Sequence, residues 1–362
     1  MRVAIVGCGV VGAAIAYELS DVPGLLVTVV EQHQPAQHST GAALGVLMGA
    51  ISQKLKGNNL RMRLFGIQRY NEWVPKLEID TGRRILFNQQ GILRLCFEGE
   101  NLDIWKKLAS VRQEQGWQLK MCDRAFLATN YPHLNLERVI GAIYSPGDRQ
   151  VDPTALTLAL VAAGQQNGVT FQFNTPVTQV LPQPDSTIQL QTSQGAIAAD
   201  WLVIAAGIGS TALTTQLQQA VDIRPVLGQA VRVKMPQPLG NPALQPVITG
   251  EDVHLVPLGN DEYWIGATVE FSDFGDPAIA LQPNPALLET VMQQAIALCP
   301  ALQHATIQHQ WYGLRPRPEG RPAPIIEPLP GHSHILLATG HYRNGVLLAP
   351  ATAAKVRELV GV

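Results

Sequence analysis

The first thirty residues alternate between apolar runs and a glycine-rich turn. A β-branched run from Val3 to Val6 leads directly into the sequence GCGVVG at residues 7–12, and the alanine-rich stretch to Leu19 favours a helix. A second β-branched run, Leu25 to Val30, ends at Glu31. This order predicts a strand, a turn, a helix and a second strand, which together make a βαβ unit.

The glycines of this unit have the spacing GxGxxG of dinucleotide-binding sites. In that pattern Gly7 makes the tight turn, Gly9 lets the backbone approach a pyrophosphate, and Gly12 lets the helix pack closely on the strand. Glu31 follows Gly12 by about 20 residues, the distance expected for a carboxylate that accepts hydrogen bonds from a ribose. A free ribose 2′-hydroxyl is therefore expected, which favours NAD or FAD over NADP. The alternative is a glycine turn in an ordinary βαβ unit.

Other periodic stretches predict the remaining elements. Helical spacing occurs at Arg61–Leu77, Leu102–Gln115, Thr154–Gln166 and Asn284–Leu298, and again from Val346. Short β runs predict strands at Ile85–Phe97, within Val221–Glu270, and, as an antiparallel meander, at Val169–Phe173, Thr175–Leu181, Thr187–Thr192 and Gly195–Ala199. Continuous apolar runs that end in glycine, typical of buried parallel strands, occur at Trp201–Gly207 and His334–Gly340.

The segment Ser39 to Gly45 consists of small residues that permit close backbone approach to a ligand. It could line a diphosphate or the edge of a flavin. The alternative is a plain helix start in which Ser39 or Thr40 caps a helical stretch that follows.

Composition sets the class of protein. The 362 residues are more than twice a usual domain of about 150, so two domains or one elaborated large domain are expected. The hydrophobic share of 46% excludes a disordered chain, and 26 basic against 28 acidic residues lack the excess that nucleic-acid binding requires. No apolar run reaches the roughly 18 residues of a membrane span. The 4 scattered cysteines predict neither a disulfide framework nor a metal site, and suit a reducing cytoplasm.

Two motifs near the C-terminus add to the dinucleotide pattern. Residues 312–316 read YGLRP and residues 340–350 read GHYRNGVLLAP. With these motifs the chain resembles the D-amino-acid oxidase superfamily of FAD enzymes over essentially its full length, and within it most closely the glycine oxidases of the thiamine pathway. The other segments that carry the resemblance are Val3–Glu31, Ser39–Gly45, Gln150–Pro153, Thr175–Val177, Ala205–Gly207 and Trp311–Pro316.

The resemblance implies an α/β fold, in which an FAD-binding doubly wound Rossmann-like domain is joined to an antiparallel-sheet substrate domain. We expect a discontinuous FAD-binding domain at residues 1–80, 146–220 and 312–362, and a substrate domain at residues 81–145 and 221–311. Related sarcosine oxidases attach their flavin to a cysteine near the position of Arg315, and this chain has none there. Non-covalent FAD is therefore expected.

The resemblance also implies which residues hold the cofactor. The glycine turn and Glu31 would hold the adenosine diphosphate, Val177 would meet the adenine through its backbone, and two later segments would flank the ribityl chain and the isoalloxazine. The expected cofactor-binding residues are Gly7, Gly9, Val10, Val11, Gly12, Glu31, Gln32, Ser39, Thr40, Gly41, Ala42, Ala43, Val177, Ala206, Gly207, Arg315, Gly340, Tyr342, Arg343, Asn344, Gly345, Val346 and Leu347.

Three residues are expected at the reaction centre. The resemblance implies that Arg343 binds a substrate carboxylate with Arg315 close by, and a guanidinium fork suits that task because it grips a carboxylate bidentately. The alternative for each arginine is a structural role. His254 stands where the related oxidases have a tyrosine, so it replaces the phenol as a donor, senses pH, or is a satisfied strand histidine. No metal site is expected.

The implied reaction is oxidative deamination of a small amino acid or amine, such as glycine, sarcosine or a small D-amino acid. Hydride would pass to flavin N5, and O2 would be reduced to H2O2. The alternatives are a dehydrogenase that uses another electron acceptor and a flavin-binding assembly or scaffold protein without turnover. The sequence does not decide whether the protein forms a homo-oligomer. Some relatives are fused to a thiazole synthase, which is not expected here because the chain ends at Val362.

Overall fold

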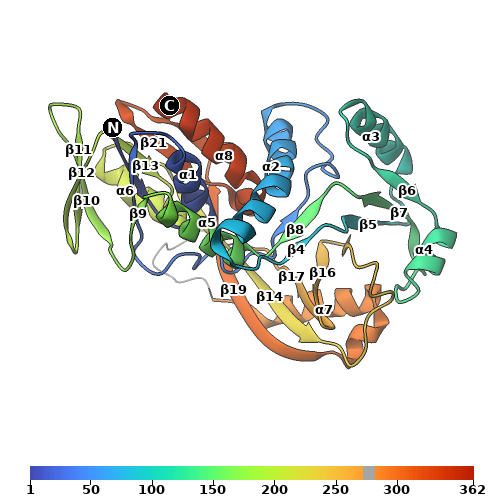
Figure 1. Cartoon of the computed structure of the whole chain (residues 1–362). Coiled ribbons are helices and arrows are strands. Elements are labelled where there is room, and N and C mark those ends of the chain that lie inside the picture. The colour runs from blue at the N-terminus through green and yellow to red at the C-terminus, as the bar shows by residue number, and fades with distance from the viewer. Residues whose placement is uncertain (272–281) are drawn as a thin grey trace.

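The computed structural model describes residues 1–271 and 282–362, and its strands form two large sheets (Figure 1). The first sheet has six strands in the order β20-β21-β13-β1-β2-β9. Its neighbours are parallel except for β20 and β21. The strands are β1 (Arg2–Val6), β2 (Leu26–Val30), β9 (Thr170–Gln172), β13 (Trp201–Ile204), β20 (Ile325–Leu329) and β21 (His332–Thr339).

Helices and a small sheet cover the two faces of this six-stranded sheet. One face packs against α1 (Val10–Ser20), α2 (Asn58–Thr81), α5 (Pro153–Gln166) and α8 (Gly345–Val360) in a core that includes Ile5, Val29 and Leu348. The other face packs against α6 (Ser210–Gln216) and the antiparallel strands β10 (Val177–Pro182), β11 (Ile188–Thr192) and β12 (Gly195–Ala199). The sheet is therefore doubly covered, as a buried parallel sheet requires.

The second sheet has nine strands and is mostly antiparallel, with β5 and β15 as a parallel pair. Its strands are β5 (Ile92–Phe97), β6 (Lys120–Cys122), β7 (Val139–Ser145), β14 (Ile223–Lys234), β15 (Val247–Gly250), β16 (Val253–Gly259), β17 (Glu262–Gly266), β18 (Glu270–Phe271) and β19 (Thr306–Pro318). The long pair β14 and β19 runs toward the first sheet (Figure 1). The strand pair therefore brings residues of the second sheet to the first.

Smaller elements complete the fold. The helix α7 (Pro285–Leu298) packs on the nine-stranded sheet. A third sheet joins β3 (Val46–Leu47), β8 (Arg149–Val151) and β4 (Phe87–Asn88). The remaining elements are α3 (Leu102–Glu114), α4 (Arg124–Asn130), and the 3-10 turns η1 (Gly207–Gly209), η2 (Pro300–His304) and η3 (Tyr342–Asn344).

The structure confirms the expected α/β fold and corrects two expected elements. Val169–Phe173 was expected in the antiparallel meander, but β9 pairs in parallel with β2, because α5 returns the chain to the edge of the first sheet. The expected helix after Ser39–Gly45 is also wrong: the two-residue strand β3 follows, and α2 begins only at Asn58. The domain boundaries stay a prediction.

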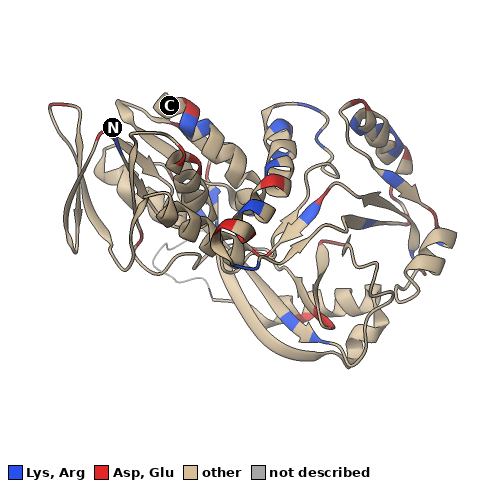
Figure 2. Cartoon of the chain, viewed as in Figure 1, with Lys and Arg blue, Asp and Glu red and all other residues tan. Residues whose placement is uncertain are grey.

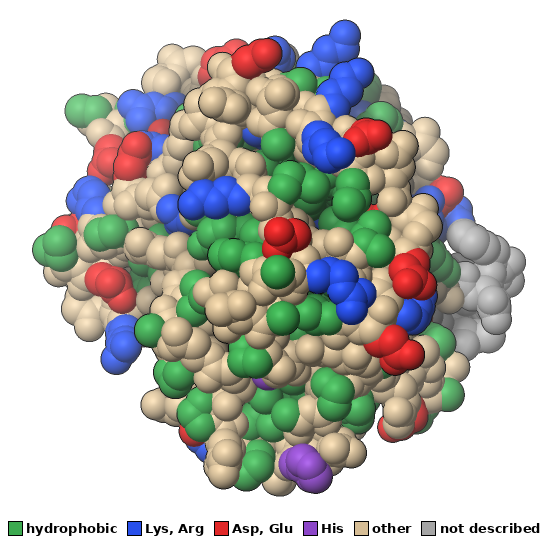
Figure 3. All heavy atoms as spheres, turned by 90° about the vertical axis from the view of Figure 1, so that its right-hand side faces the viewer, with side chains coloured by type: hydrophobic (Ala, Val, Ile, Leu, Met, Phe, Trp, Pro, Cys, Tyr) green, Lys and Arg blue, Asp and Glu red, His purple; other side chains and the backbone are tan. Residues whose placement is uncertain are grey.

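Charged side chains are spread over the molecule rather than gathered by sign. Both α2 and α3 carry basic as well as acidic residues (Figure 2). The face that carries α3 and α4 likewise shows both signs scattered among apolar side chains (Figure 3). In the described residues, no helix is both long and apolar enough to cross a membrane.

Candidate active site

The glycine turn between β1 and α1 leaves no room for side chains. Gly7 has φ of +105°, and a Cβ atom there would lie 2.6 Å from the carbonyl oxygen of Ala205, just after the neighbouring strand β13. A Cβ atom on Gly12 would lie 2.0 Å from the carbonyl oxygen of Gly7. The first turn of α1 therefore packs directly on the strand end, and a helix that starts at such a glycine turn is suited to bind an anion.

Glu31 lies beside this turn, immediately after β2. Its Oε2 accepts a hydrogen bond from the Cys8 backbone at 2.7 Å, and its Oε1 accepts one from the His33 backbone at 3.0 Å. Each carboxylate oxygen has a second lone pair left for a ribose hydroxyl. The residues Gly7–Gly12 and Glu31 are called the dinucleotide cradle below.

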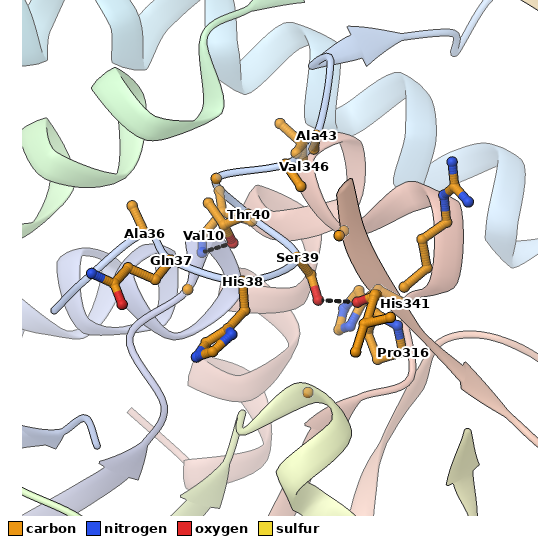
Figure 4. Close-up of a pocket in the computed structure, with 18 of the residues that line it drawn as sticks. Val10, Ala36, Gln37, His38, Ser39, Thr40, Ala43, Pro316, His341 and Val346 are labelled. Carbon is orange, nitrogen blue, oxygen red and sulfur yellow. Dashed lines mark hydrogen bonds between the residues drawn. The ribbon is translucent and has the colours of Figure 1, made fainter. Parts of the chain in front are cut away.

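The segment Ser39–Gly45 crosses the cradle and is tied to it. Thr40 does not cap a following helix; its Oγ1 accepts a hydrogen bond from the Val10 backbone at 3.0 Å, in the first turn of α1 (Figure 4). Ser39 donates its hydroxyl to the Leu314 carbonyl oxygen at 2.5 Å (Figure 4), and Trp311 donates Nε1–H to the Ala42 carbonyl oxygen at 3.1 Å. The segment thus joins the cradle to β19.

The C-terminal motif approaches the same place from the other end of the chain. After β21, Gly340 has φ of +67°, η3 follows, and α8 begins at Gly345. His341 is buried and pairs through Nε2 with the Thr352 hydroxyl at 2.9 Å. Burial lowers the pKa of His341 to about 4, so its ring is neutral at pH 7.

One cavity of about 1350 Å³ joins these segments. This volume exceeds that of ordinary small-ligand pockets, so it can take a dinucleotide together with a small substrate. Of the expected site residues, those that line it are Gly7, Gly9, Val10, Val11, Glu31, Gln32, Ser39, Thr40, Gly41, Ala42, Ala43, Ala206, Gly207, His254, Arg315, Gly340, Tyr342, Arg343, Gly345, Val346 and Leu347. Gly12, Val177 and Asn344 lie outside the lining, Gly12 because the helix packs on the strand there.

Other lining residues were not singled out from the sequence. They are Pro35, Ala36, Gln37, His38, Thr154, Arg232, Asp252, Trp264 and His309, among others. The loop at residues 35–38 carries no periodic pattern, and its left-handed residues Ala36 and His38 are not glycines, so the sequence held no signal for it. Trp264 and His309 are cross-strand neighbours of Arg232 on β14, which requires the strand register.

The two expected arginines have different surroundings. Arg315 lies on β19 and is partly buried, and it donates from Nη1 to the Leu227 carbonyl oxygen and from Nη2 to the Thr268 carbonyl oxygen, both at 3.0 Å. Burial, and next the repulsion from Arg343, lower the pKa of Arg315. Arg343 is exposed at the cavity, with its guanidinium 5.7 Å from the Tyr342 ring centroid.

No carboxylate forms an ion pair with either arginine within the described residues. Two guanidinium groups that repel each other in a partly desolvated cavity favour an anion between them. Arg315 and Arg343 are called the arginine pair below.

His254 lies next to the arginine pair, on β16. Its Nδ1 is buried and has no hydrogen-bond partner among the described residues. Burial, and next the charge of Arg343, lower its pKa to about 4. The ring is therefore neutral at pH 7 and has donor or acceptor capacity to spare for a ligand.

The cradle fits a dinucleotide with a second ring system. The diphosphate is suited by the start of α1 and by the glycine turn, where added side chains would clash with the backbone. The cavity continues from this turn to the arginine pair. Residues 1–271 and 282–362 contain no group of three or more metal-ligating side chains. The glycine turn, Glu31 and the long cavity are the features that fit a dinucleotide.

Comparisons with known proteins agree with the cavity. The family model "DAO: FAD dependent oxidoreductase" matches residues 2–359. The chain is 33% identical to the bifunctional protein ThiO/ThiG of Nostoc sp. over 99% of this chain and 52% of that protein, so it spans about half the length of such relatives. It is 29% identical to a glycine oxidase of Geobacillus kaustophilus, over 99% of this chain and 92% of that protein.

Solved structures extend the agreement to the fold. A crystal structure of glycine oxidase from Geobacillus kaustophilus matches with a TM-score of 0.88 at 29% identity, covering 99% of this chain and 94% of that chain. A crystal structure of glycine oxidase from Bacillus cereus matches with a TM-score of 0.87 at 26% identity, covering 99% and 95%. From the cradle, the cavity and these matches, the chain belongs to the DAO family of FAD-dependent oxidoreductases.

Proposed function

We propose that the protein binds FAD non-covalently and oxidatively deaminates a small amino acid or amine that carries a carboxylate. Glycine, sarcosine and small D-amino acids are the first substrates that we expect. The similarity to glycine oxidases supports this choice, and so does the similarity to ThiO/ThiG proteins. The ThiO/ThiG relatives favour thiamine synthesis as the pathway, and the four scattered cysteines suit a location in the cytoplasm.

The arginine pair is the observation that carries the proposal. Arg343 reaches the cavity from η3 and Arg315 reaches it from β19, with no acidic partner among the described residues. A substrate carboxylate that enters between them neutralises their repulsion and gains charge-assisted hydrogen bonds. The substrate is thereby fixed in one orientation, which is the main contribution that an enzyme of this kind makes to a cofactor-driven reaction.

Neutral His254 completes the pocket in this proposal. Because its pKa is about 4, it adds no positive charge near pH 7 and offers a ring nitrogen as a hydrogen-bond donor. The substrate amine has to be neutral to lose hydride, so a neutral neighbour is compatible with the reaction. No described residue is required to act as a general acid or base.

FAD supplies the two-electron acceptor when it is bound. In the overall reaction, an amino acid, water and O2 give an oxo acid, ammonia or a released amine, and H2O2. FAD would be held by the cradle, by Ser39–Ala43 and by Gly340–Leu347. These residues would all lie in the FAD-binding domain, at residues 1–80, 146–220 and 312–362. All four cysteines are buried, which supports non-covalent binding.

The test is anaerobic reduction of the flavin. The purified protein is mixed with glycine, sarcosine and a panel of small D-amino acids, and the visible flavin band is followed before and after air is admitted. We expect one of them to bleach the band, with recovery and H2O2 in air. Recovery only with a quinone or a dye identifies a dehydrogenase, and a yellow protein that no amine bleaches refutes the proposed function.

Arg343→Leu sharpens this test. Removing the guanidinium is expected to raise the KM for amino carboxylates about a hundredfold while FAD stays bound, because charge-assisted hydrogen bonds to a carboxylate are lost. Lys355→Ala, on the exposed side of α8, is the matched control and keeps the wild-type KM. An unchanged KM in Arg343→Leu would remove Arg343 from substrate binding.

A further inference from the structure

Gly228 is a glycine in the interior of β14, where glycine weakens a strand. Such a glycine commonly marks a place where another group approaches the backbone closely. Its φ does not lie in the left-handed region, so backbone conformation does not require it. A Cβ atom at this position would lie 2.2 Å from Nη2 and 2.4 Å from Cζ of Arg315. The guanidinium therefore rests on the strand in the space that a side chain would occupy.

Two backbone carbonyls fix the guanidinium in this seat. The Leu227 and Thr268 carbonyl oxygens accept from Nη1 and Nη2 of Arg315, each at 3.0 Å. Thr268 is itself held, because its hydroxyl donates to the buried carboxylate of Glu270 at 2.5 Å and accepts from the Gln229 backbone at 2.8 Å. Two of the five guanidinium N–H donors are used in this way, which leaves three for a ligand.

We propose that Gly228 is a positioning residue that makes Arg315 the oriented carboxylate fork of the active site. The proposal rests on the proposed function. Arg343 is exposed and held by no hydrogen bond within the described residues, so it attracts an anion without fixing its direction. Arg315, seated on Gly228, fixes that direction and thereby selects substrates that carry a carboxylate.

The nature of the obstruction makes the inference testable. Alanine at position 228 meets the tip of a flexible side chain, so the fold can accept it by moving the guanidinium. Gly313 lies directly opposite Gly228 on β19, and a Cβ atom there would instead lie 2.2 Å from the Cβ atom of Ala42, in the segment that crosses the cradle. The two glycines therefore form a matched pair for substitution, because an added methyl group displaces Arg315 at one position and Ala42 at the other.

The experiment is a double-mutant cycle on the FAD-loaded protein with Gly228→Ala, Arg315→Ala and both together. Acetate binding is measured by calorimetry and by the flavin difference spectrum. KM and kcat are measured with the amino acid that reduces the flavin fastest. We expect Gly228→Ala to raise the Kd of acetate and the KM about tenfold to a hundredfold, with a smaller change in kcat. In the Arg315→Ala background the same substitution should change the Kd of acetate and the KM less than about twofold, because the effects of two residues that act through one contact are not additive.

Melting temperatures give a second cycle that needs no ligand. Gly228→Ala should lower the melting temperature in the wild-type background and not in the Arg315→Ala background, whereas Gly313→Ala should lower it in both. Equal effects of Gly228→Ala in both backgrounds, or no effect on acetate binding, would overturn the inference. Wild-type protein that binds no acetate and is reduced by no amino acid refutes the proposed function instead.

Discussion

The dinucleotide cradle and the arginine pair lie in one cavity but are built in different ways. The cradle comes from one continuous stretch within residues 1–31, and the close approach of a ligand to its backbone depends on the missing side chains of its glycines. The arginine pair and His254 come from η3, β19 and β16, which are far apart in the chain, and they act through side-chain charge. The first region depends on backbone geometry, and the second depends on electrostatics and tertiary placement.

Two glycines show what this difference means for substitution. A Cβ atom on Gly12 would meet a backbone carbonyl oxygen at 2.0 Å, whereas one on Gly228 would meet a side-chain tip at 2.2 Å. The backbone of a packed βαβ unit cannot move away without breaking its strand and helix contacts. A substitution in the cradle should therefore disrupt folding and FAD binding together. A substitution at the arginine pair should change substrate binding while FAD binding and the fold are kept.

The largest expected effect comes from Gly12→Ala. Its added methyl group has no route except displacement of α1 from β1, which costs about 3 kcal/mol or more and removes FAD binding together with catalysis. The measurement is FAD retained after gel filtration, with the melting temperature beside it. Gly9→Ala is the matched variant, since its Cβ atom meets only the Thr40 hydroxyl at 2.9 Å, and it should keep weakened FAD binding. Full FAD binding by Gly12→Ala would break the comparison.

Acid should destabilise the folded chain by several kcal/mol through three histidines, of which His254 and His341 line the cavity. Burial lowers the pKa of His133, His254 and His341 to about 4 each. The unfolded chain takes up these protons near pH 6.5, so between pH 6.5 and 4 it binds more protons than the folded chain does. The free energy of unfolding should therefore fall as the pH drops through this range, by up to about 3 kcal/mol for each histidine.

Urea unfolding at a series of pH values measures this dependence. His133→Leu removes one buried titrating ring away from the cavity lining, so its unfolding free energy should fall less between pH 6.5 and 4. An identical pH dependence in His133→Leu would show that this ring is protonated equally in the folded and unfolded chains.

The smallest expected effect is that of His254→Phe. The change keeps an aromatic ring and removes the nitrogen that has no partner at Nδ1, so KM should rise about threefold to tenfold, as for one neutral hydrogen bond. The Kd of FAD should stay at the wild-type value, because His254 lies on β16 and is not part of the cradle. Steady-state kinetics and flavin titration check both. A loss of FAD would show that the two regions are not separable.

The sequence predicted the parts of this fold whose signal is local. The βαβ unit, the helix α5 and the buried strands β13 and β21 follow from the hydrophobic period and the glycine spacing. It was wrong for Val169–Phe173, because strand partners depend on where α5 returns the chain. It was also wrong for the stretch after Ser39–Gly45, because Thr40 accepts from the Val10 backbone in another element instead of starting a helix.

The sequence by itself determined where the dinucleotide cradle lies, because the glycine spacing, the two flanking strands and Glu31 fall within one βαβ unit. The close approach of Gly7 to Ala205 and of Gly9 to Thr40 was decided by the tertiary structure. The family motifs placed Arg315 close to Arg343 and pointed to His254, without saying what holds each side chain. Only the tertiary structure decided that Arg315 rests on Gly228 between two carbonyl oxygens while Arg343 stays free of hydrogen bonds among the described residues. Strand register and burial set these contacts, which join Arg315 to residues 47 and 88 positions away in the chain.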